Sequence, residues 1–182
     1  MIVWLNGTFG AGKSSTAAEL AGILPGARQF DPEDVGYMLK ANLADQDFTD
    51  FQQLPPWRTL VPVVMAEVAA LTGQHLIAVQ TVLTESYWRE LIAGLAARSL
   101  EVFHVVLHAD PAVLERRIRA DTVEPRACQW RLDHLGEFAA ARQWLEPAAD
   151  LVIDSTHLSV NEVAQTVAAA AEPRLGLAVP AR

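Results

Sequence analysis

The stretch GTFGAGKS at residues 7–14 has the residue types and the spacing of a loop that binds phosphate groups. It fits the pattern G-x-x-x-x-G-K-[S/T], in which glycines let backbone N–H groups turn toward a phosphate chain. Lys13 would reach the β- and γ-phosphates of a nucleoside triphosphate, and Ser14 would offer its hydroxyl to Mg²⁺. The sequence therefore predicts that ATP and Mg²⁺ are bound here, with cofactor contacts from Gly7, Thr8, Phe9, Gly10, Ala11, Gly12, Lys13, Ser14 and Ser15.

Two carboxylates follow a predicted short strand at 27–31. Ligands of open parallel sheets bind beyond the carboxyl ends of the strands, where the phosphate-binding loop also lies. A kinase of small hydroxyl compounds needs a carboxylate that holds or deprotonates the acceptor hydroxyl. We expect Asp31 to play that catalytic role and Asp34, one turn into the next helix, to help bind the substrate. The alternative is that Asp31 only caps that helix.

Four further residues are candidates for binding the acceptor. Thr81 and Glu85 follow another strand at the same edge, with a helix cap and a surface acid as the alternatives. Trp57 could stack on a base or sugar, and Arg58 could hold a phosphate. Their alternatives are packing in the core for Trp57 and plain surface exposure for Arg58.

Six arginines gather within the later third of this acidic chain: Arg116, Arg117, Arg119, Arg126, Arg131 and Arg142. Planar guanidinium groups match the charge that spreads over the oxygens of a transferring phosphoryl group. A lid carrying them over about 116–142 would close on the phosphates and exclude water. The alternative is a solvated helix face with pairs such as Glu115–Arg119. Ser155 and Thr156 follow the last strand and would border the adenine.

Apolar stretches alternate with helix-like stretches along the chain. Near-continuous apolar strands separated by helices are typical of a parallel sheet covered on both faces. We predict an α/β, three-layer P-loop kinase-like fold, with a five-stranded parallel sheet flanked by helices and a lid segment. One domain is expected over 1–182, with an acceptor-covering segment at about 32–72. The expected strands are 2–6, 27–31, 75–82, 102–109 and 150–154, and the later helices are 59–72, 84–98, 111–120, 129–145 and 159–171, before an irregular tail from 173.

Composition narrows the class of function. The chain has 182 residues, 51% of them hydrophobic, and a net charge of −8, which does not suit nucleic-acid binding. A single cysteine and the absence of a secretory pattern favour a cytoplasmic protein with a small-molecule substrate. The sequence carries no signal for an oligomeric state.

These motifs resemble the nucleoside monophosphate kinase-like group of P-loop proteins. Arg117 and the loop after it look like the start of an adenylate kinase lid, which implies that Arg117 stacks on adenine. Arg131 and Arg142 resemble the two arginines that clamp the transferring phosphate. Asp121 departs from the pattern, because those kinases often have another arginine there.

A closer resemblance is to the tunicamycin-resistance (TmrB-like) family. WLNGTFGAGKSSTA is similar to its opening, FDPEDVGYML (30–39) to its second block and WRLDHL (130–135) to a third. The resemblance implies ATP binding and protection against tunicamycin, a uridine-containing, fatty-acylated antibiotic, by phosphorylation. Some members attach to membranes through a C-terminal amphipathic helix; here the C-terminus is only weakly amphipathic and lacks a basic face, which argues against membrane attachment.

Three functions stay open at this point. The first is an ATP-dependent phosphotransferase acting on tunicamycin or a related nucleoside. The second is an ordinary nucleotide or metabolite kinase. The third is a protein that binds nucleotide and drug without transfer, which remains open because the strand end at Gln80-Thr81 has no acid to support Mg²⁺.

Overall fold

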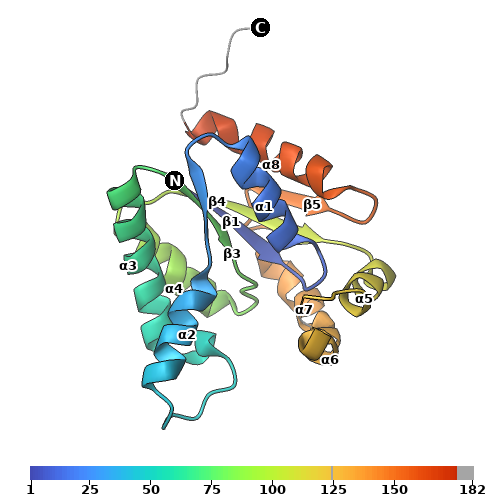
Figure 1. The fold of residues 1–182 in the computed structure, drawn as a ribbon, viewed down its shortest axis with the longest axis horizontal. Helices are drawn as coiled ribbons and strands as arrows, with labels where there is room; N and C mark the ends of the chain where they lie inside the picture. Colours follow the sequence, from blue (N-terminus) through green and yellow to red (C-terminus); the bar gives the residue numbers. More distant parts are fainter. Residues whose placement is uncertain (124, 176–182) are drawn as a thin grey trace, which may run out of the picture.

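The computed structural model describes residues 1–123 and 125–175, and its centre is a parallel sheet with the strand order β2-β3-β1-β4-β5 (Figure 1). Every residue of β1 is buried, because helices cover both faces of this central strand. Such burial explains why IVWLNG is almost continuously apolar rather than alternating. The strands are β1 (Ile2–Gly7), β2 (Ala27–Phe30), β3 (His75–Val79), β4 (Val102–His108) and β5 (Leu151–Asp154).

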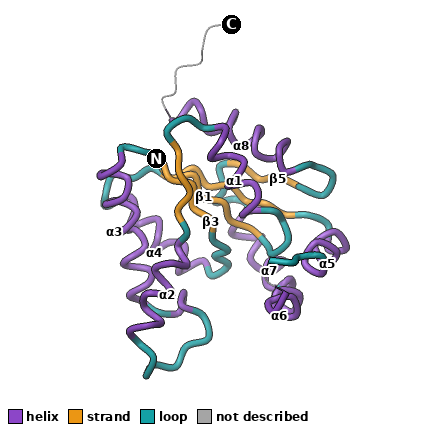
Figure 2. Tube along the Cα trace, in the orientation of Figure 1, coloured by secondary structure: helices purple, strands orange, loops and turns teal. Residues whose placement is uncertain are grey.

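Two layers of helices enclose the sheet (Figure 2). On one face, α1 (Lys13–Ile23) and α8 (Val160–Leu175) pack on the odd-numbered side chains of β1, such as Val3 and Leu5. On the other face, α3 (Pro55–Thr72) and α4 (Glu85–Ala96) pack on Ile2 and Trp4 together with α2 (Pro32–Asn42). The alternation of β1 side chains between two cores is the expected period of a strand.

A buried polar network fixes the end of β1. Asn6 is fully buried; its Oδ1 accepts from the N–H of Gly7 at 2.8 Å and from that of Val82 at 2.9 Å. Its Nδ2 donates to the carbonyl of Val82 at 3.1 Å and lies 3.4 Å from Nε2 of His104. Burial lowers the pKa of His104, so the neutral imidazole is favoured. The network ties the end of β1 to the chain after β3 and to β4, next to the phosphate-binding loop.

The lid region is helical and differs from the expectation in one respect. A single helix was expected over 129–145, but the chain forms α6 (Cys128–Asp133) and α7 (Leu135–Leu145), which meet at His134. Before them comes α5 (Pro111–Arg119), which matches the helix expected over 111–120. The loop expected after it contains a short 3₁₀ turn, η2 (Pro125–Ala127). The break lets α6 lie over the phosphate-binding loop while α7 packs on Val106 of the sheet.

Other boundaries also differ from the expectation. The strand expected over 75–82 ends at Val79, so Gln80 and Thr81 follow β3 rather than belong to it. The helix expected from 59 begins at Pro55, after a 3₁₀ turn, η1 (Phe51–Gln53). The last helix continues to Leu175, whereas an irregular tail was expected from 173; the rest of that tail, 176–182, lies outside the described residues. Across the described ranges, none of the helices has both the length and the apolar character needed to cross a membrane.

Candidate nucleotide and acceptor site

Glycines shape the loop between β1 and α1. Gly7 has φ +122°, and a Cβ on it would lie 2.0 Å from the carbonyl oxygen of Leu107 on β4. Gly10 has φ +75° and lies against Ile118 of α5. Gly12 has φ +95° and begins α1 without a side-chain cap. Only glycine adopts all three conformations readily, so the loop's backbone is shaped for close approach of an anion at a helix N-terminus.

Lys13 folds back onto this loop. Its Nζ donates to the carbonyl oxygens of Thr8 at 2.9 Å and Gly7 at 3.2 Å. The pKa of Lys13 is lowered to about 7, chiefly by burial and in part by the nearby guanidinium of Arg131, while the carboxylate of Glu33 opposes the shift. These electrostatic effects show that a lid arginine and an α2 carboxylate both act on the lysine of the loop.

One large cavity adjoins the loop at the carboxyl edge of the sheet. Its volume is about 1400 Å³, which exceeds the usual range for a drug-sized ligand. The cavity is bounded by the phosphate-binding loop, by the arm made of α2 and η1, by the chain after β3, and by the lid. Its lining includes Phe9, Lys13, Ser14, Glu33, Tyr37, Lys40, Phe48, Asp50, Phe51, Gln52, Gln80, Thr81, Leu83, Tyr87, Arg126, Trp130, Arg131, His134 and Glu137.

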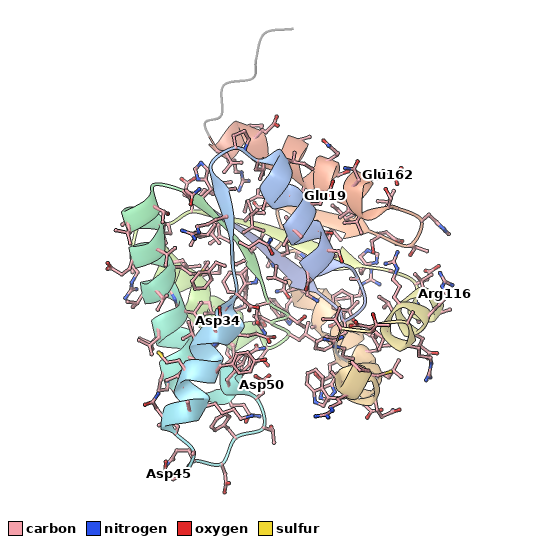
Figure 3. The ribbon with its side chains drawn as sticks, in the orientation of Figure 1. Glu19, Asp34, Asp45, Asp50, Arg116 and Glu162 are labelled. Carbon is pink, nitrogen blue, oxygen red and sulfur yellow. The ribbon has the colours of Figure 1, made fainter. Side chains whose placement is uncertain are left out.

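The arm and α7 face each other across this cavity. Burial raises the pKa of Asp50, which lies just before η1, and the carboxylate of Glu137 on α7 raises it further. Figure 3 labels Asp50 and Asp34 on this arm. Mutual influence of Asp50 and Glu137 is expected only if the two walls are close. Residues of the arm and of α7 therefore line the same cavity from two sides.

The carboxylates of α2 are arranged differently from the expectation. Asp31 caps the helix, and its Oδ1 accepts from the N–H of Glu33 at 2.9 Å. The cavity lining includes Glu33, whose Oε2 lies 3.4 Å from the hydroxyl of Tyr37, but includes neither Asp31 nor Asp34. Asp34 is exposed. The structure thus places Glu33, which the sequence did not single out, at the cavity, and gives Asp31 the capping position that was its alternative.

Trp57 and Arg58 both lie in the interior. Trp57 is 0% exposed, and its Nε1 donates to the carbonyl of Pro32 at 3.0 Å. Arg58 pairs with Glu90 at 2.7 Å, donates to the carbonyl of Gln52, and stacks 4.2 Å from the ring of Tyr87. Neither side chain lines the cavity. Their contacts correct the expected direct role: they hold η1 and α2, which form the arm.

Thr81 lies at the cavity and Glu85 does not. The hydroxyl of Thr81 donates to the carbonyl of Gly7 at 3.0 Å, and its own carbonyl accepts from Nε2 of Gln52 at 2.9 Å. Glu85 pairs with Arg89 at 2.6 Å on the surface of α4. Thr81 therefore joins the loop to the arm, and Glu85 matches the alternative of a surface acid.

The lid contributes one of its two expected clamping arginines to the cavity. Arg131 lines it and pairs with Asp121 at 2.5 Å. Arg142 lies on α7 outside the cavity lining and pairs with Glu146 at 2.6 Å. Trp130 of α6 packs edge-on against Phe9 of the loop, with ring centroids 5.0 Å apart. The lid thus contacts the loop in this structure through an aromatic pair.

Arg117 lies between the loop and the end of β5. It donates to the carbonyl of Ser155 at 2.8 Å and to its hydroxyl at 3.1 Å. The Ser155 hydroxyl in turn donates to the carbonyls of Ala11 and His108, each at 3.0 Å. Thr156 donates from its hydroxyl to Asp154 and accepts from the N–H of Asp110. The structure therefore brings Arg117 and Ser155 together beside the loop, and their expected contacts with adenine stay a prediction. Neighbouring Arg116 points outward from α5 (Figure 3).

The residues present fit a nucleoside triphosphate with its magnesium ion. The buried Thr8 hydroxyl has no hydrogen-bond partner among the described residues, and the uncapped α1 N-terminus with Lys13 supplies donors and positive charge. The described residues contain no group of three or more His, Cys, Asp or Glu side chains placed to hold a metal ion. Mg²⁺ is usually bound through substrate phosphates, waters and one or two protein oxygens. Ser14 and Glu33 line the same cavity.

Comparison with known proteins gives a consistent result. The family model described as an AAA domain matches residues 2–127. The tunicamycin resistance protein of Deinococcus radiodurans has a similar structure, with a TM-score of 0.69 and 30% identity over 100% of this chain and 98% of that chain. No curated protein matches the sequence.

Two more distant structures share the fold. A sugar kinase from Janibacter has a TM-score of 0.67 at 16% identity, covering 98% of each chain. A shikimate kinase from Bacteroides thetaiotaomicron has a TM-score of 0.60 at 18% identity, covering 97% of this chain and 99% of that one. With the sheet order, these matches confirm the predicted P-loop kinase-like fold.

Proposed function

The chain belongs to the tunicamycin-resistance family of P-loop proteins, and from that membership we propose that it is an ATP-dependent phosphotransferase acting on tunicamycin or a similar nucleoside-like hydroxyl compound. One observation carries the proposal. A single cavity is lined by the lysine and serine of the phosphate-binding loop and by the arm that would cover an acceptor. A phosphate donor and an acceptor of nucleoside size would therefore lie side by side, as direct transfer needs.

The loop side of the cavity would hold the phosphates. Lys13 and the loop amides would bind the β- and γ-phosphates, and Ser14 would offer its hydroxyl to Mg²⁺. When bound, the ion would neutralise charge on the phosphate oxygens. Arg131 would stabilise the transferring group from the lid, where it already lies close enough to lower the pKa of Lys13. Arg117 and Ser155 border the position expected for adenine.

The arm would act on the acceptor. A carboxylate of α2 takes the proton of the acceptor hydroxyl while that oxygen forms a bond to the γ-phosphorus. The bond from the γ-phosphorus to the bridging oxygen breaks, and ADP leaves. Glu33 is the carboxylate that lines the cavity, and Asp31 caps the helix that carries it. We therefore assign proton transfer to Glu33 and the placing of Glu33 to Asp31.

One observation keeps a second candidate, binding without transfer. The chain after β3 presents Thr81 toward the loop, where many P-loop enzymes have an acid for Mg²⁺. A site with weak magnesium support would hold nucleotide and drug and protect by sequestration.

Mass spectrometry of tunicamycin incubated with the protein, ATP and Mg²⁺ tests the proposal. The expected product is tunicamycin heavier by one phosphate, formed in many turnovers and absent with Lys13→Ala. A panel of nucleosides and sugars in the same assay separates a drug kinase from a metabolite kinase, for which a metabolite would be the far better acceptor. Unchanged tunicamycin that binds at one molecule per protein would contradict the proposal and support sequestration.

A further inference from the structure

Gln80 is a buried polar side chain at the cavity that the proposed mechanism does not use. It follows β3 directly, is 5% exposed and lines the cavity. Its backbone is held on both sides: its N–H donates to the carbonyl of Leu5 at 3.2 Å, and its carbonyl accepts from Nε1 of Trp4 at 3.2 Å. The side chain is therefore presented from a rigid position at the centre of the sheet edge.

The pleat of the strand decides which side Gln80 faces. Leu76, Ala78 and Val82 belong to the core under α3 and α4, so even-numbered residues of this segment point toward that face. Thr81 points the other way, because its hydroxyl donates to Gly7 of the phosphate-binding loop. Gln80 thus lies on the acceptor side of the cavity, and Thr81 occupies the side where a magnesium-supporting acid would act.

The side-chain oxygen of Gln80 lacks a hydrogen-bond donor among the described residues. This atom, Oε1, is buried. Leaving a buried acceptor unsatisfied costs free energy, so such an atom calls for a donor from a ligand, an ion or a water molecule, and a position on the cavity wall allows a ligand to supply it. A primary amide offers an acceptor and donors in one plane, which complements a cyclic amide or imide edge better than a hydroxyl.

Aromatic rings line the same cavity as Gln80. Phe48, Phe51 and Tyr87 are among its lining residues, and the guanidinium of Arg58 lies 4.2 Å from the centroid of the Tyr87 ring. Phe51 is held against Trp57, with ring centroids 5.4 Å apart. Rings in fixed positions favour a flat ligand that stacks while its edge forms hydrogen bonds.

We propose that Gln80 is a specificity-determining residue that binds the acceptor through its amide, and that the acceptor carries a flat ring with a cyclic amide or imide edge, of the kind found in a pyrimidine base. This inference rests on the proposed function in one respect, since it calls the ligand an acceptor. Binding of that ligand by Gln80 does not require phosphoryl transfer. Gln80 Oε1 accepts from the ring N–H of the ligand, and Gln80 Nε2 donates to an adjacent ring carbonyl.

Calorimetric titration of the full-length protein, with Mg²⁺ and a non-hydrolysable ATP analogue present, tests the pairing. The probes are uridine, 3-methyluridine (which lacks the ring N–H) and ribose. Uridine is expected to bind at least about tenfold more tightly than 3-methyluridine or ribose. Gln80→Met should weaken uridine binding by a similar factor. In this variant the affinities for uridine and 3-methyluridine should differ by less than about twofold. Gln143 is an exposed glutamine on α7, so Gln143→Met is the matched control. It should change neither the affinity for uridine nor the effect of N-methylation on that affinity.

Each other outcome has a defined meaning. Equal binding of uridine and 3-methyluridine by the unaltered protein, or uridine binding that Gln80→Met leaves within twofold, would overturn the inference; the first result does not depend on whether the variant folds. Uridine binding that depends on Gln80 without any phosphorylated tunicamycin would leave this inference standing and remove the proposed function. Phosphorylation of tunicamycin by Gln80→Met with an unchanged KM for tunicamycin would support the proposed function and overturn this inference.

Discussion

The ammonium group of Lys13 donates to the carbonyl oxygen of Thr8 at 2.9 Å, so the lysine of the phosphate-binding loop is folded onto the loop itself. Bound phosphates would compete with the carbonyls of Thr8 and Gly7 for the same three donors. On nucleotide binding, Lys13 therefore exchanges two neutral backbone carbonyls for negatively charged phosphate oxygens. The lowered pKa of Lys13 makes this exchange measurable.

Proton uptake on ATP binding is the first prediction. With a pKa of about 7, Lys13 is mostly neutral at pH 8, and bound phosphates favour the charged form and raise the pKa. Binding at pH 8 should therefore take up about one proton through Lys13, and at pH 6 about none. Calorimetry in two buffers of different ionisation enthalpy measures the number. Lys13→Met should abolish the pH 8 uptake; equal uptake in variant and parent would refute the assignment.

Gly7→Ala should damage both stability and nucleotide binding. The new Cβ would lie 2.0 Å from the Leu107 carbonyl at a φ of +122°, so the loop must move away from β4. We expect the free energy of unfolding to fall by at least about 2 kcal/mol and ATP affinity to fall more than about tenfold. Gly22→Ala on α1 meets nothing within 4 Å and should be neutral or slightly stabilising. Denaturant unfolding and ATP titration check both, and parent-like ATP affinity in Gly7→Ala would contradict the close packing of loop on strand.

The two α2 carboxylates should separate in their kinetic effects. Glu33→Gln keeps the shape of the cavity and removes the base, so kcat should fall at least about a hundredfold with little change in ATP affinity. Asp31→Asn keeps a helix-capping oxygen and should lower kcat far less. Steady-state kinetics with the best acceptor decide the matter. If kcat falls more in Asp31→Asn than in Glu33→Gln, the general base is Asp31 and not Glu33.

Gly36→Ala should disturb the arm made of α2 and η1 without changing the affinity for ATP. A Cβ on Gly36 would lie 2.6 Å from Cγ of Phe51, so the η1 ring must shift. The clash should outweigh the better helix propensity of alanine and cost about 1–3 kcal/mol of stability. KM for the acceptor should rise while the Kd for ATP stays within twofold. Adding Phe51→Leu should recover part of both losses, and Gly136→Ala, which meets nothing within 4 Å, serves as the control.

The sequence predicted the elements that depend on local patterns. The phosphate-binding loop follows from glycine spacing, and the sheet follows from apolar strands between helices. Arg117 was expected to stack on adenine, which stays a prediction, and it lies against Ser155 beside the loop.

The site predictions that differ from the structure depend on the direction in which a side chain points once the helices have packed. Trp57 was expected at the acceptor, but its indole N–H finds a carbonyl inside the core. Arg142 was expected at the phosphates, but the break at His134 separates α7 from α6, and Glu146 one turn on pairs with it. Glu33 was overlooked because a capping Asp31 two residues earlier looked like the better candidate; its position at N2 of α2, turned toward the loop, appears only in three dimensions.

Phosphorus NMR of one reaction tests the central claim, that the γ-phosphoryl group of ATP passes directly to an acceptor in this cavity. The reaction contains the full-length protein, ATP, Mg²⁺ and tunicamycin, with Lys13→Ala in parallel. The account predicts a new phosphoester resonance that grows in step with ADP and is absent with Lys13→Ala. ADP that appears only with inorganic phosphate, or ATP that stays intact while tunicamycin is bound, would contradict it.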